Sequence, residues 1–205
     1  MRAGLVALAG LLLFAMLVPA VQAQSGPVLV AKIDSEITRG TVEYVRAAIE
    51  RAEFVDARAL VFRFDTPGGG LEETQEIQRM FLATRIPIIG WVAPAGTNAW
   101  SAGTILLEST DFAAMAPFTV IGSVQPVVIT GSGFEPVTDA KILNALVASL
   151  QETLRLHARN ETLASAFIRD NLNLNADEAL AAGAIEAVAA TIDDLLLAAD
   201  GFALP

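Results

Sequence analysis

Two glycine-containing turns carry the residues of this sequence that could do chemistry, and each follows an apolar run typical of a strand. The first turn, residues 65–70, follows the run 59–64 and ends in consecutive glycines. The second, residues 96–103, follows the run 86–92 and contains Ser101. Because glycine tolerates positive φ, the first turn can point backbone N–H groups outward, while the second places a hydroxyl where a helix begins. Acyl transfer needs both a nucleophile and donors of this kind for an oxyanion.

Ser101 is the candidate nucleophile. An isolated serine in a segment rich in glycine and alanine is more often a small packing residue or a helix cap, so its position is what favours catalysis. It follows a strand and a glycine turn, and Ala102 would offer its N–H from the start of a helix, as in a nucleophile elbow. Gly69 would supply the second donor to the oxyanion.

A serine hydroxyl needs a base, and few residues qualify. His157 is the only histidine, and the arginines at 155 and 159 predict a solvated helix end around it. The chain has two lysines, Lys32 and Lys141, against eleven arginines. A lysine in an apolar setting can lose its proton near neutral pH, whereas an arginine cannot. Lys141 begins a predicted helix beside apolar residues and fits this need, although an ordinary solvent-facing lysine explains the same pattern.

Composition limits the classes of function. The chain has 205 residues, is 54% apolar and contains no cysteine, which excludes disulfides, thiolate catalysis and cysteine-bound zinc. With one histidine and no tight acidic cluster, we expect no metal and no cofactor. The net charge of −10 argues against nucleic acid as a partner, because phosphate neutralisation needs clustered lysine and arginine.

The N-terminus has the pattern of an export signal. A positive start, an apolar stretch over 3–18, a proline at 19 and small residues at 21–23 predict a signal peptide over 1–23 that is cleaved before Gln24. The stretch is shorter than the ~20 residues that span a bilayer, so cleavage is favoured over an uncleaved anchor. We therefore expect one domain over 24–205, located in the periplasm or at the outer face of the membrane.

From residue 27 onward, short β-like runs alternate with helical patterns, which predicts a layered α/β domain with a mostly parallel central sheet flanked by helices. The expected strands are 28–33, 59–64, 87–92, 112–116, 119–121 and 185–189. The expected helices are 41–54, 71–85, 101–107, 139–159, 161–169, 175–182 and 191–199. The glycine-containing segment 130–136 predicts a mobile loop, of a kind that often borders a substrate cleft.

Several of these segments together resemble one protease family. The motifs are Asp-Thr-Pro-Gly-Gly at 65–69, Ala-Trp-Ser-Ala-Gly at 99–103, Met-Ala-Pro at 115–117 with Ile-Gly-Ser at 121–123, Lys141, and the segment 176–188. Over about residues 28–199 the chain resembles the NfeD-type membrane-associated serine proteases, which have the ClpP/crotonase fold. The resemblance implies that Ser101 is the nucleophile and Lys141 the base, with Gly69 and Ala102 as oxyanion donors.

The resemblance also implies a substrate class. Family members cleave exposed apolar segments, notably those of stomatin-like membrane proteins, and self-associate as homo-oligomers. Trp100 departs from the family, which usually has a small residue at this place. Two other functions remain as alternatives: a catalytically silent scaffold that binds an apolar tail, and a crotonase-like acyl-CoA enzyme. Export and the serine–lysine pair argue against the second.

Overall fold

The elements of the domain alternate between strands and helices in the computed structural model, which describes residues 26–131 and 133–202. The expected signal peptide, 1–23, lies outside the described residues. The helices are α1 (Arg39–Phe54), α2 (Leu71–Ala83), α3 (Ala102–Glu108), α4 (Ala140–Leu156), α5 (Leu163–Arg169), α6 (Ala176–Ala182) and α7 (Ile192–Ala199). The strands are β1 (Val28–Ile33), β2 (Ala59–Phe64), β3 (Ile88–Val92), β4 (Asn98–Trp100), β5 (Phe112–Met115), β6 (Val120–Gly122), β7 (Val127–Thr130), β8 (Gly133–Pro136), β9 (Asn173–Asn175) and β10 (Ala187–Val188).

Five of the strands form a parallel sheet in the order β1-β2-β3-β5-β10. All five residues of the central strand, β3, are buried, because helices cover a parallel sheet on both faces and its strands are therefore continuously apolar. The sheet confirms the layered α/β prediction, and β1 and β2 have the bounds that the sequence predicted.

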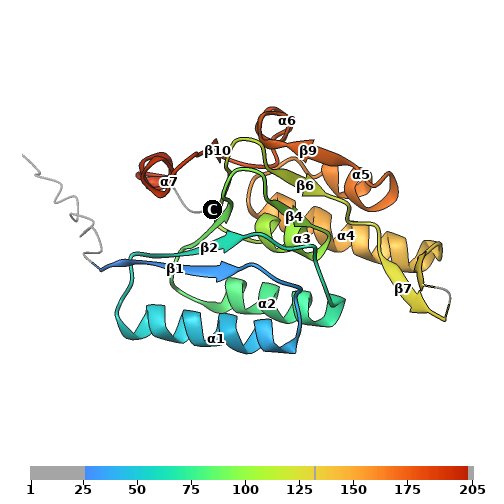
Figure 1. The fold of residues 1–205 in the computed structure, drawn as a ribbon, viewed down its shortest axis with the longest axis horizontal. Coiled ribbons are helices and arrows are strands. Elements are labelled where there is room, and N and C mark those ends of the chain that lie inside the picture. Colours follow the sequence, from blue (N-terminus) through green and yellow to red (C-terminus); the bar gives the residue numbers. More distant parts are fainter. Residues whose placement is uncertain (1–25, 132, 203–205) are drawn as a thin grey trace, which may run out of the picture.

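Helices α1 and α2 lie side by side along one face of the sheet, as Figure 1 shows. A core that includes Val45, Ile77 and Phe62 fills the space between them and the strands. On the other face a second, smaller core includes Trp91 and Ala114, and α7 contributes Leu195. None of the helices within the described ranges is long and apolar enough to cross a bilayer.

A second sheet holds the segment before Ser101; the sequence predicted one of its strands, at 119–121, but not the other two. Its order is β4-β6-β9, with β4 parallel and β9 antiparallel to β6. Each of these strands has three residues, too few to show a periodic pattern. Ala99, Ile121 and Leu174 point inward from the three strands and are buried.

The prediction of a mobile loop at 130–136 is wrong in part, because the region forms an antiparallel β-hairpin. Strands β7 and β8 pair from Val127↔Pro136 to Thr130↔Gly133, with Gly133 at a φ of 124°. The glycines that suggested a loop are therefore at the turn end of the hairpin. The hairpin projects from one end of the molecule, beyond the first turn of α4 (Figure 1).

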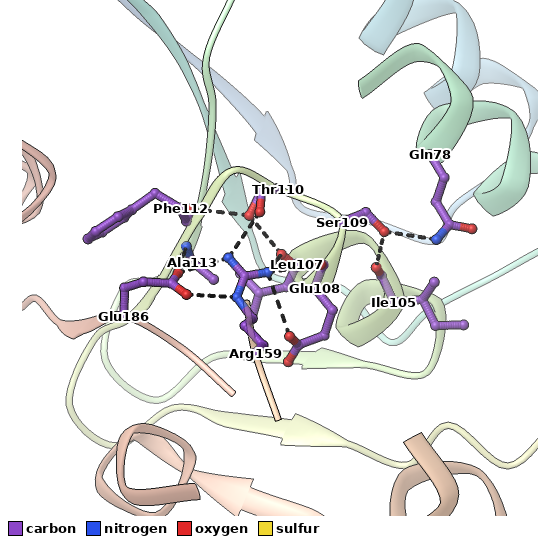
Figure 2. Close-up of polar contacts among 10 residues, drawn as sticks. All are labelled: Gln78, Ile105, Leu107, Glu108, Ser109, Thr110, Phe112, Ala113, Arg159 and Glu186. Carbon is purple, nitrogen blue, oxygen red and sulfur yellow. Dashed lines mark hydrogen bonds and ion pairs between the residues drawn. The ribbon is translucent and has the colours of Figure 1, made fainter. Parts of the chain in front are cut away.

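Just past the end of α4, Arg159 is buried in a polar cluster (Figure 2). Its guanidinium donates two hydrogen bonds to Glu186, of 2.9 and 2.8 Å, and its Nη1 lies 3.7 Å from Glu108 Oε2. His157 is also buried, so the prediction of a solvated helix end is wrong. Burial, with a smaller contribution from the charge of Arg159, lowers the pKa of His157 to about 4.

Glu108 gives the domain a specific dependence of stability on pH. Complete burial raises the pKa of this carboxyl from 4.5 to about 8, against the opposing charge of Arg159. Between these two values the folded chain keeps a proton that the unfolded chain has lost, so stability falls as pH rises from about 4.5 to about 8.

We predict that Glu108→Gln, whose amide resembles the protonated carboxyl, removes the loss of stability that the wild type shows as pH rises. Measured by urea unfolding, the difference in free energy of unfolding between the variant and the wild type should move in favour of the variant by at least about 1 kcal/mol from pH 5 to pH 9. A gain of about 1 kcal/mol corresponds to a rise of about 2–4 °C in Tm for a domain of this size. A difference that stays constant with pH would contradict the prediction.

Candidate active site

Ser101 lies at a sharp turn between strand β4 and helix α3. Its φ of 53° and ψ of −117° lie in a sparsely populated region of backbone space. The Ser101 N–H donates to Gly122 O at 2.8 Å, and its hydroxyl accepts and donates no hydrogen bond among residues 26–131 and 133–202. The side chain is half-buried. Strand, strained turn and helix thus have the geometry expected of an elbow at Ser101, and we call this turn the elbow.

The first glycine turn lies directly against this elbow. A Cβ atom on Gly68 would lie 2.8 Å from Ser101 Cβ and 3.0 Å from Trp100 O, and Gly68 has a φ of 107°. A Cβ on Gly69 would lie 2.2 Å from Ile37 O. The turn is held between Ile37 and the elbow at distances that only glycine allows.

Two threonines that the sequence analysis missed fix the elbow. Thr66 accepts the Trp100 N–H at 3.0 Å through its carbonyl and the Gly68 N–H at 3.1 Å through Oγ1. Thr104 Oγ1 donates to Ala99 O at 2.7 Å and accepts from Gly122 N at 2.8 Å. Both side chains are buried. The contacts of Thr66 with Trp100 and of Thr104 with Gly122 join segments that are distant in the sequence, so the sequence did not indicate them.

The predicted oxyanion donors belong to the two segments that meet at Ser101. The Gly69 N–H belongs to the turn that abuts the elbow, and the Ala102 N–H is the first of helix α3. Neither donates a hydrogen bond to another atom in the described part of the chain. Unpaired N–H groups at a helix start and in a glycine turn favour a negative oxygen.

Lys141 is the second residue of α4, where Asp139 caps the helix by accepting from Lys141 N at 2.8 Å and Ile142 N at 3.1 Å. The side chain of Lys141 is exposed rather than held in an apolar setting. Helices α3 and α4 contact each other, but no hydrogen bond joins Ser101 to Lys141 in this structure.

Exposed apolar side chains accompany each segment of the site. Leu71 follows the glycine turn, Trp100 precedes Ser101 and Ile142 follows Lys141. Their exposed fractions are 43%, 40% and 47%. Large apolar groups on an exposed surface beside reactive groups are typical of a site that binds apolar ligands.

Comparison with protein families gives one match over most of the chain. Residues 27–200 match the family model described as "NfeD1b, N-terminal domain". The membrane-bound protease PH1510 of Pyrococcus horikoshii is 35% identical over 175 residues, which cover 85% of this chain and 40% of the relative. The chain spans about two fifths of the length of the curated relatives that it matches.

Solved structures show the same fold. A serine-to-alanine mutant of the protease 1510-N, described as membrane-bound and stomatin-specific, has a TM-score of 0.84 at 33% identity, covering 87% of each chain. A lysine-to-alanine mutant in complex with a substrate peptide has a TM-score of 0.83 at 34% identity, covering 86% of this chain and 81% of that one. The ClpP catalytic domain of Plasmodium falciparum has a TM-score of 0.61 at 16% identity, covering 80% and 86%, so the fold is ClpP-like.

The two glycines with positive φ at 68 and 96 offer a matched pair of substitutions. Gly68→Ala adds a methyl group against Ser101 as well as backbone strain, and should cost about 2 kcal/mol or more. Gly96→Ala, with a φ of 87° and nothing within 4 Å, should cost only the strain, about 1 kcal/mol. Urea unfolding measures both, and equal losses would mean that the elbow can move away from the turn.

The strain at Ser101 predicts a stabilising substitution. Ser101→Gly should raise the free energy of unfolding by about 1 kcal/mol, because relief of ~1–3 kcal/mol of strain exceeds the ~0.5–1 kcal/mol that glycine costs in entropy. Ser101→Ala retains the strain and should show no such gain in the same urea titration. If both variants unfold at the same urea concentration as the wild type, the backbone at Ser101, with its φ of 53°, is not strained.

Proposed function

The chain belongs to the family of NfeD1b N-terminal domains, and on this basis we propose that it is a serine endopeptidase with a Ser101–Lys141 dyad. The observation that carries the proposal is the strained elbow at Ser101, flanked by the unpaired N–H groups of Gly69 and Ala102. In the 1510-N structures the substituted serine and lysine are 41 positions apart, against 40 between Ser101 and Lys141. This nearly equal spacing supports the choice of both residues.

The proposed reaction is acyl transfer to Ser101 and then to water. Neutral Lys141 accepts the hydroxyl proton as Ser101 Oγ attacks a peptide carbonyl, and the Gly69 and Ala102 N–H groups stabilise the oxyanion. Lys141 returns the proton to the departing amine, which leaves an acyl-enzyme. Lys141 then deprotonates a water molecule, which hydrolyses the ester, and the proton returns to the Ser101 oxygen.

The substrate itself completes the environment of Lys141. In the free chain this amine is exposed to water. An apolar peptide bound over Leu71, Trp100 and Ile142 would exclude water from the amine and favour its neutral form. Catalytic contacts that are absent in a free enzyme can form when substrate binds. Apolar sequence is therefore required for reaction as well as for affinity.

The substrate class follows from that surface and from the relatives. We propose exposed apolar segments of membrane proteins, with stomatin-like proteins as the first candidates, since 1510-N is described as stomatin-specific. We also propose export of the domain, from the signal pattern at 1–23, and self-association into homo-oligomers.

Two variants test the dyad. A fluorophosphonate probe should label the wild type, and Ser101→Ala should abolish labelling and cleavage of an apolar peptide. Lys141→Arg keeps the positive charge but cannot act as a base, so cleavage should fall by about 100-fold or more with the fold intact. Labelling is measured by mass spectrometry and folding by circular dichroism.

Lys32→Arg is the matched control, because Lys32 is the other lysine of the chain and lies on β1. It should leave cleavage unchanged. A wild type that binds an apolar peptide without labelling or cleavage would reject the enzyme and indicate a scaffold. Full activity in Lys141→Arg would reject the lysine as the base.

A further inference from the structure

Arg159 lies where the C-terminal ends of two helices meet. Helix α4 ends at Leu156, and the chain turns back through Ala158, which has a φ of 57°, so that Arg159 N donates to Leu154 O at 2.8 Å. Its guanidinium reaches the last turn of α3. The N-terminal ends of these same helices carry Ser101 and Lys141.

The guanidinium binds several elements at once, as Figure 2 shows. Nη1 donates to Glu108 O at 2.8 Å, and Nη2 donates to Thr110 O at 2.9 Å, which satisfies carbonyls at the end of α3. Nε and Nη2 donate to the two oxygens of Glu186. Glu186 in turn accepts Ala113 N at 2.6 Å and so fixes the cluster to strand β5.

From this geometry we propose that Arg159 is a positioning residue that sets the relative placement of α3 and α4, and through them of Ser101 and Lys141. This inference rests on the function proposed above. Helix α3 is seven residues long, about 10 Å, and α4 is seventeen, about 26 Å. A small rotation at the shared end therefore moves Lys141 further than it moves Ser101.

Arginine is required here because of its shape. Its planar fork places donors toward Glu108 O, Thr110 O and both oxygens of Glu186 at fixed angles, whereas a lysine ammonium is a single point with three donors. The side chain is 1% exposed, so water cannot replace a lost contact. A positive charge at the C-terminal end of α3 also matches the helix dipole, whose other end faces the oxyanion.

The test is Arg159→Lys, which keeps the charge and loses the fork. We expect kcat for an apolar peptide to fall by about 10- to 100-fold with KM within about twofold, because a displacement of ~1 Å at a reacting group can cost about 100-fold in rate. Labelling of Ser101 by the fluorophosphonate should slow by a similar factor. General loss of stability would instead lower the concentration of active enzyme without slowing labelling of the folded fraction.

A second measurement does not need activity. The chain has no cysteine, so Glu72→Cys beside the glycine turn and Ala145→Cys on α4 accept two nitroxide labels at exposed positions. Electron spin resonance should give one narrow distance in the wild-type background. In the Arg159→Lys background, the distance should shift or broaden.

Trp91→Phe is the matched control, because it removes a buried hydrogen bond, from Nε1 to Ala189 O at 3.0 Å, in the second core under α7. It should lower stability without changing kcat or the label distance. If Arg159→Lys fails to fold, Glu186→Gln weakens the same cluster and should give smaller changes in the same direction.

The outcomes separate the two proposals. Unchanged kcat and an unchanged distance in Arg159→Lys, or changes equal to those of Trp91→Phe, would overturn the positioning role. A wild type that neither cleaves nor labels would overturn the proposed function. In that case the distance measurement alone decides whether Arg159 sets the position of α4 relative to α2, whose first turn follows the glycine turn that lies against Ser101.

Discussion

The structure around the site depends on how closely two backbone segments approach each other. Gly68 lies so near Ser101 and Trp100 that no side chain fits between them, and its neighbour Gly69 is equally close to Ile37. The buried Thr66 joins both segments through its backbone and its hydroxyl. Because the contact is between main chains, it positions N–H groups with little freedom to move, which is the preorganisation that oxyanion stabilisation requires. The rest of the small sheet holds the elbow at that distance.

Much of the fold could be predicted from sequence because its strongest signals are local. Strand β3 is a continuous apolar run, β1 and β2 are apolar except for one charged residue each, and α1 and α4 have apolar residues at helical spacing. The types and most of the bounds of these elements were therefore correct. The glycine turn and Ser101 were singled out from residue type together with their position after an apolar run. Strands β4 and β9 were missed because three residues carry no period, and the hairpin because its glycines resemble a loop. Whether such a short segment forms a strand depends on its pairing with another strand, which its own sequence does not show.

Burial at the end of α4 was predicted wrongly for a related reason. A histidine between two arginines is usually solvated, and nothing local indicates that Glu186, 27 residues later, neutralises Arg159 inside the protein. A guanidinium stays charged and is buried only with a partner, and the partner of Arg159 comes from the end of the sheet. The converse error concerns Lys141, whose apolar neighbours predicted shelter although the side chain is exposed. In both cases the environment of a charge was set by residues remote in sequence.

The β7–β8 hairpin stands apart from this network, since among the strands of residues 26–131 and 133–202 its two strands pair only with each other. Val127, Ile129 and Phe134 are at least half exposed. Its sequence can therefore diverge in evolution with little thermodynamic penalty, unlike the crowded positions around Ser101. Because the chain enters it from β6 and leaves it toward Lys141, such divergence would occur next to the site rather than at a remote surface. Substitutions in the hairpin would therefore change the surface beside Lys141 and leave the packed segments around Ser101 as they are.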